Sequence, residues 1–139
     1  DLAQMARTAG NPALRVLAFR GLVRLGRESE GAAETRLKLF SEAMDAAQNA
    51  DDKKLVLGAL GEIHTVEALR LAAGCLAEAG LEDEAGAAVV RIAAKLDTPT
   101  EETMAALRRV AEKTAIPSVA EDARKQVKRL ESQAKPADK

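Results

Sequence analysis

The sequence is almost without aromatic side chains: its 139 residues include no Trp and no Tyr, and the two aromatic residues are Phe19 and Phe40. A hydrophobic core therefore has to be built from thin aliphatic contacts. Ala and Gly on helix faces let helix axes approach closely, which suits helices stacked side by side. We interpret Gly58 and Gly61, which fall inside one predicted helix, as sites of such close packing.

Cysteine and long apolar runs are also scarce. Cys75 is the only cysteine, which excludes an internal disulfide and a cysteine-based metal site and leaves the compartment unknown. No run approaches the roughly 18 apolar residues of a membrane span, so we expect no membrane insertion. No signal peptide is visible at the N-terminus. Because Asp1 opens in mid-pattern and is not Met, we expect a piece of a longer protein.

The sequence lacks the short motifs that mark common enzymes, namely P-loop, dinucleotide-binding, HExxH, CxxC and GxSxG patterns. We therefore predict no enzymatic activity, no catalytic residue, no metal site and no cofactor. Cys75 falls in an apolar helical stripe, where we expect a small buried hydrophobe. His64 is the only histidine, and we expect it to complement the dipole at the C-terminus of a helix.

The strongest pattern that is present is the stretch NPALRVLAFRGLVRLG, residues 11–26. Asn11 is a favoured N-cap residue, and Pro12 suits the first helical position. Helical spacing predicts an apolar face made of Leu14, Leu17, Ala18, Gly21, Leu22 and Leu25. The other side of this helix is basic and carries Arg15, Arg20, Arg24 and Arg27.

The same face recurs three more times along the chain. Matching Arg24 to Glu62, then to Arg91, then to Arg129 gives steps of 38, 29 and 38 residues. The apolar positions follow this register in two series: Ala18, Val56, Ala85 and Ala123, and Leu22, Leu60, Val89 and Val127. Self-similarity with a period of about 30 to 45 residues, one helix pair per period, is the signature of an α-solenoid.

The remaining patterns predict further helices over residues 1–9, 35–49, 53–64, 65–79, 81–96, 100–114 and 118–132. Thr98 and Glu101 are spaced as a capping box, with proline between them at the first helical position. We therefore predict an all-α fold with one domain over residues 1–132. The tail over residues 133–139 is polar and contains proline, so we expect it to be disordered.

The stretch NPALRVLAFRGLVRLG resembles HEAT and related armadillo-type repeats, and DDKKLVLGALGEI, residues 51–63, resembles the latter half of such a unit. The chain is also similar to HEAT-like modules of large bacterial proteins, which accompany enzyme or c-type haem domains in extracytoplasmic settings. The resemblance implies a right-handed superhelix of about four antiparallel helix pairs. It also implies that the second helices line a concave face that binds protein.

The polar side of these second helices is the one candidate binding surface. We call it the basic stripe, and its members are Arg20, Arg24, Arg27, Arg91, Lys95, Lys125, Lys128 and Arg129, with Glu62 interrupting them. Three interpretations are open: an ordinary solvated helix face, a site for a protein or peptide, and a groove for a phosphate backbone. The acidic Glu62, the absence of aromatics for base stacking and the formal net charge of -1 count against nucleic acid.

The sequence thus predicts a non-catalytic protein interaction or scaffolding module. The alternatives are a nucleic-acid-binding HEAT-like domain and an accessory repeat domain of a larger bacterial enzyme. If an active site lies between repeats, Glu62 is the one carboxylate that we nominate for it.

Overall fold

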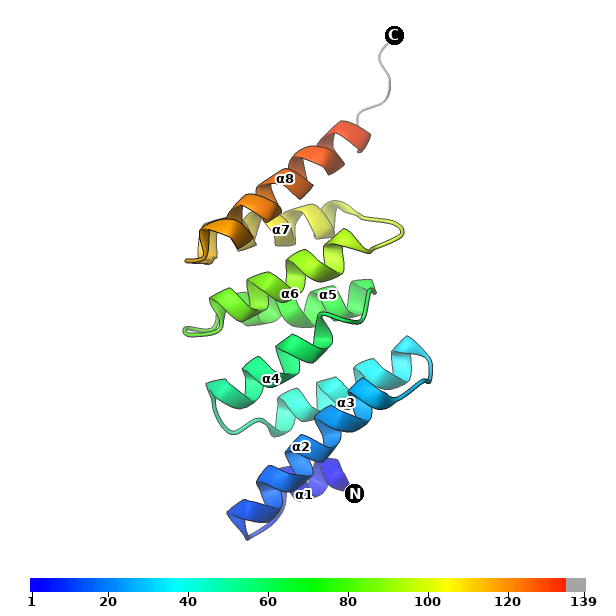
Figure 1. Cartoon of the computed structure of the whole chain (residues 1–139), viewed down its shortest axis with the longest axis vertical. Coiled ribbons are helices and arrows are strands. Elements are labelled where there is room, and N and C mark those ends of the chain that lie inside the picture. Colours follow the sequence, from blue (N-terminus) through cyan, green and yellow to red (C-terminus); the bar gives the residue numbers. More distant parts are fainter. Residues whose placement is uncertain (135–139) are drawn as a thin grey trace. The chain divides into compact units, whose positions relative to one another are not determined.

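The computed structural model describes residues 1–134, which form eight α-helices and one short 3₁₀ helix, with no β-strand among them (Figure 1). The predicted all-α fold is confirmed. The helices are α1 Leu2–Thr8, α2 Pro12–Glu28, α3 Ala33–Ala46, α4 Ala50–Leu60, α5 Val66–Gly74, η1 Cys75–Ala77, α6 Glu82–Ala94, α7 Glu101–Lys113 and α8 Pro117–Ala134. No helix within the described residues is both long and apolar enough to cross a membrane.

Contacts group the chain into two compact units, Asp1–Ile63 (unit 1) and His64–Lys139 (unit 2). The prediction of a single domain over residues 1–132 stays a prediction. The last helix extends two residues beyond its expected end, to Ala134. The rest of the predicted disordered tail, 135–139, lies outside the described residues.

Polar side chains begin several helices, as the sequence predicts. The side-chain oxygen of Asn11 accepts a hydrogen bond from the Ala13 amide at 2.8 Å, and Pro12 is the first residue of α2. Asn49 caps α4 in the same way, through the Asp52 amide at 2.9 Å. Each cap pairs an amide that the first helical turn would otherwise leave without a partner.

The capping box predicted at Thr98 is wrong by two residues. Thr100 has extended backbone, so α7 begins at Glu101. The Thr103 amide donates to the Thr100 hydroxyl at 3.4 Å, and the Thr100 amide donates to the Thr103 hydroxyl at 3.1 Å. The two threonines therefore form the capping box between them, and the Glu101 side chain does not take part in it.

Unit 1 consists of two helix layers, with α2 and α4 in one and α1 and α3 in the other (Figure 1). Helices adjacent in sequence pack across the layers, and α2 contacts α4 within its layer. The largest fully buried side chains of the unit are those of Phe40, Val56, Leu57, Leu60 and Ile63. Small residues fill the space between helices, as the shortage of aromatics requires, and they include Ala18, Ala43 and Ala46.

Unit 2 has the same layering, with α6 and α8 in one layer and α5 and α7 in the other (Figure 1). Its core is aliphatic and includes Leu69, Leu76, Leu81, Val89, Ile92, Leu107 and Val110. Cys75 is buried, as predicted for a small hydrophobe. The side-chain amide of Gln126 on α8 donates to the Val90 carbonyl of α6 at 3.1 Å. This hydrogen bond joins the two helices of one layer.

The predicted apolar face of α2 is wrong at three leucines. Leu14, Leu17 and Leu25 are 45%, 65% and 47% exposed. The buried residues of this helix are Ala18, Phe19, Leu22, Val23 and Gly26. The buried face is rotated toward Phe19 and Gly26 because the Phe40 ring of α3 packs directly on Gly26.

The close packing predicted at Gly58 is also wrong. This glycine is exposed, and a Cβ added there would meet only the Arg27 guanidinium, at 3.9 Å. Gly61 is buried and forms the C-cap of α4. Because turn hydrogen bonds close α4 at Leu60, the exposed His64 lies beyond the last helical turn, so its predicted capping role is wrong.

Candidate functional site

A groove in unit 1 runs between α2 and α4 and has a volume of about 350 Å³. We call it the arginine groove, and it is lined by Arg20, Val23, Arg24, Arg27 and Glu28 of α2 and by Leu55 of α4. Three members of the predicted basic stripe therefore line a single groove.

The spacing of the arginines along α2 explains why they share one wall. Positions 20, 24 and 27 are separated by four and three residues, which places their side chains on the same helical face. The Asn11 cap fixes the N-terminal end of this helix. Near its other end, the Arg36 guanidinium of α3 donates from Nε to the Gly26 carbonyl at 2.9 Å. The arginine wall is therefore anchored at both ends.

The positive charge of this wall is not neutralised within the described part of the chain. Among residues 1–134, none of Arg20, Arg24 and Arg27 takes part in an ion pair. A guanidinium keeps its charge at all physiological pH values. Glu28 is the only acidic residue among those that line the groove, so cationic side chains outnumber it three to one.

The opposite wall adds an aliphatic surface. Leu55 of α4 is 47% exposed, and Val23 lies buried beneath the arginines. The 38-residue step of the repeat register aligns Leu55 with Leu17 of the predicted apolar face, so the sequence pattern did not indicate Leu55 as a site residue. Both leucines are exposed, so the shared repeat position points outward in two successive copies.

Glu62, the acidic residue that interrupts the basic stripe, faces a different partner. Its Oε1 lies 4.0 Å from Nη2 of Arg36, with both side chains partly exposed. The same Arg36 donates to the C-terminal end of α2, as described above. Glu62 thus supports the arginine that closes α2, and it does not line the arginine groove.

The predicted cations of unit 2 are spread over two helices. Arg91 and Lys95 lie at the C-terminal end of α6, and Lys125 and Arg129 lie one turn apart on α8, all exposed. Lys125 lines a groove between α7 and α8, together with Arg108, Ala111, Glu112, Glu121, Arg124, Val127, Lys128 and Glu131. This groove carries both signs of charge. A continuous stripe from Arg24 to Arg129 stays a prediction.

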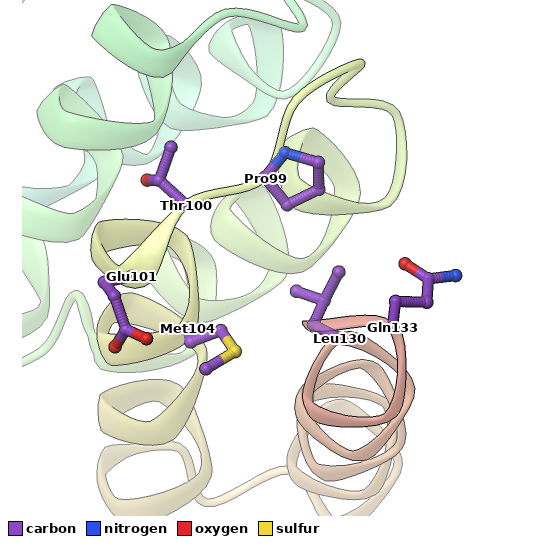
Figure 2. Close-up of a pocket in the computed structure, with 6 residues that line it drawn as sticks. All are labelled: Pro99, Thr100, Glu101, Met104, Leu130 and Gln133. Carbon is purple, nitrogen blue, oxygen red and sulfur yellow. The ribbon is translucent and has the colours of Figure 1, made fainter. Parts of the chain in front are cut away.

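A third pocket lies at the other end of the same helix pair, with a volume of about 230 Å³. Figure 2 shows Met104 of α7 directed toward α8, where Leu130 and Gln133 lie, with Pro99 above them. Met104 and Leu130 are both buried. Nothing in the sequence patterns pointed to this pocket.

The described residues contain no cluster of three or more His, Cys, Asp or Glu side chains that could hold a metal ion. Comparison of the sequence with protein-family models gives no match, and comparison with curated proteins gives none either. The arginine groove is therefore the candidate site that the geometry supports best.

Proposed function

We propose that this chain is a non-catalytic protein interaction or scaffolding module, and that it binds a protein or peptide partner in the arginine groove. The observation that carries the proposal is the convergence of Arg20, Arg24 and Arg27, none of which forms an ion pair with another of residues 1–134. Charged side chains that stay unpaired on an anchored helix are available to an incoming ligand without first breaking an internal contact.

We further propose that the fold is a HEAT-like, right-handed superhelix of about four antiparallel helix pairs. The repeat register supports this, because one repeat position is buried in each of α2, α4, α6 and α8, where it is occupied by Ala18, Val56, Ala85 and Ala123. The layering inside each unit, with alternate helices in alternate layers, is also what stacked helix pairs produce.

A phosphate backbone is the alternative ligand of the same three arginines, because guanidinium groups pair with phosphates as readily as with carboxylates. The net charge of -1 and the presence of Glu28 in the groove favour a protein partner. The role of accessory domain in a larger bacterial enzyme remains compatible with either ligand.

The proposal is tested by quantitative capture of partners from lysate of the source cell. The site variant carries Arg20→Glu, Arg24→Glu and Arg27→Glu. The matched control carries Arg7→Glu, Lys38→Glu and Arg109→Glu, three exposed cations outside the groove, so that both variants change the net charge equally. Circular dichroism confirms that both are folded.

We expect the site variant to lose a specific protein that the wild type and the control retain after nuclease treatment. Capture of the same proteins by all three forms would contradict the proposal. Capture that disappears with nuclease treatment would instead favour nucleic acid as the ligand.

A further inference from the structure

We propose that the occupant of the arginine groove is an acidic segment in which acidic residues alternate with aliphatic ones. This inference rests on the proposed function and adds the chemistry of the partner. It follows from the two walls of the groove, one cationic on α2 and one aliphatic at Leu55 of α4.

The charged wall sets the number and spacing of the acidic groups. A helix rises 1.5 Å per residue, so the wall from Arg20 to Arg27 is about 10 Å long. An extended chain covers that distance in about three residues, at roughly 3.3 Å each. Two carboxylates on alternate residues therefore match the wall, and each can accept hydrogen bonds from a guanidinium.

The aliphatic wall selects the residue that lies between the two acidic residues of the bound segment. Side chains of an extended segment point alternately to opposite sides. When the acidic side chains face Arg20 and Arg24, the intervening side chain faces α4, where Leu55 is 47% exposed. Covering this leucine removes apolar surface from water, which a purely acidic or phosphate ligand does not do.

The far end of the groove limits the segment. Glu28 follows Arg27 by one residue and repels a further carboxylate at that position. The Arg27 guanidinium reaches toward α4, as its 3.9 Å approach to the Cβ position of Gly58 shows. The groove therefore takes a short acidic run that ends before Glu28, rather than a long polyanion.

The direct test uses the full chain and a fluorescent peptide of alternating glutamate and leucine, with binding followed by anisotropy. The control peptide has glutamine in place of glutamate. Two further probes, an alternating glutamate and serine peptide and a single-stranded oligonucleotide, report the aliphatic and phosphate contributions. Amide chemical shifts in the isotope-labelled protein locate the binding site.

We expect saturable binding of the glutamate and leucine peptide, with shifts confined to α2 and α4 and an affinity that falls as salt is added. Arg24→Glu should weaken binding about tenfold or more, because it removes one charge-assisted contact and adds repulsion. Arg24→Gln, which removes the positive charge without adding a negative one, should have a smaller effect in the same direction. Arg109→Glu on α7 is the matched control and should leave binding unchanged.

The aliphatic wall is tested separately. Leu55→Ser should weaken binding of the leucine peptide severalfold and should leave the serine peptide unaffected. Equal binding of the glutamine peptide, insensitivity to Arg24→Glu, tighter binding of the oligonucleotide or shifts confined to α7 and α8 would each overturn the inference. If the peptide does not bind but the captured protein still depends on the three arginines, the partner chemistry is wrong and the proposed function stands.

Discussion

Gly26 shows how tightly one residue can be fixed in a core that has few aromatic side chains. A Cβ built at this position lies 2.5 Å from Cε1 and 2.8 Å from Cζ of Phe40. Phe40 is completely buried, so its ring cannot move aside into solvent. We predict that Gly26→Ala destabilises the fold by roughly 1 to 3 kcal/mol, because overpacking outweighs the gain of up to about 1 kcal/mol in helix propensity.

Gly74→Ala is the matched control for this prediction. Gly74 has helical backbone angles, and a Cβ there meets nothing within 4 Å. Alanine should therefore stabilise by about 0.4 to 1 kcal/mol, because it narrows the unfolded ensemble at no steric cost. Urea unfolding of both variants gives the two free energies. Equal stability of the two variants would show that the Phe40 ring does not press on Gly26.

The error at the leucines of α2 has the same physical cause. Periodicity counts apolar residues and therefore favoured Leu14, Leu17 and Leu25. It cannot register that the Phe40 ring of α3 packs on Gly26, where the missing Cβ lets the ring approach the backbone closely. The buried face followed the packing of Phe40, and the leucines became surface.

At the scale of elements, Asp83 connects two helices that sequence periodicity treats as independent. Its carboxylate lies in the first turn of α6, where a negative charge complements the positive end of the helix dipole. The same Oδ1 accepts hydrogen bonds from the Thr114 hydroxyl and the Ala115 amide, both at 2.8 Å. Thr114 is the C-cap of α7, so Asp83 holds the turn from α7 to α8.

We predict that Asp83→Ala destabilises unit 2 by roughly 1 to 3 kcal/mol, since the carboxylate has two hydrogen-bond donors in this turn. Glu84→Ala is the control, because it removes a carboxylate from the same helical turn and should cost about 1 kcal/mol at most. Thermal unfolding followed by circular dichroism measures both. If the two variants lose similar amounts of stability, the interaction with the helix dipole would be the whole contribution of Asp83.

A second link between elements joins α5 to α7. The Arg70 guanidinium donates from Nε to Glu102 at 2.7 Å. This hydrogen bond, with a smaller contribution from the opposite charge, holds the pKa of Glu102 below its ordinary value against the opposing effect of desolvation. We predict that Arg70→Gln raises the pKa of Glu102 back toward that ordinary value.

The sign of the associated stability change follows from the same shift. Because the pKa of Glu102 is lower in the folded state, the pair stabilises the fold above the unfolded-state pKa and loses this effect as pH falls through the folded-state pKa. Both side chains are exposed, so added salt should weaken the effect. Carbon-detected NMR titration of the Glu102 carboxyl in wild type and Arg70→Gln measures the shift. Identical titration curves would contradict the interaction.

At the scale of the whole molecule, the sequence predicted the helices and the arginines of the candidate site better than it predicted the site itself. Helical spacing was enough to place Arg20, Arg24 and Arg27 on one face of α2. The groove also depends on Leu55 and on the approach of α4, which are properties of packing between helices separated by another helix. A pattern within one helix does not contain that information.

The proposed superhelix makes a final prediction about size. A compact domain of 139 residues has a radius of gyration of about 14 Å, from the scaling of globular proteins with chain length. Helix pairs stacked in one direction spread the same mass along an axis, so small-angle X-ray scattering should give a clearly larger value and a skewed distance distribution. Residual dipolar couplings should show the axes of α2, α4, α6 and α8 turning in one right-handed sense. A radius near 14 Å would contradict the superhelix and would leave the arginine groove, which unit 1 forms by itself, as the feature on which binding depends.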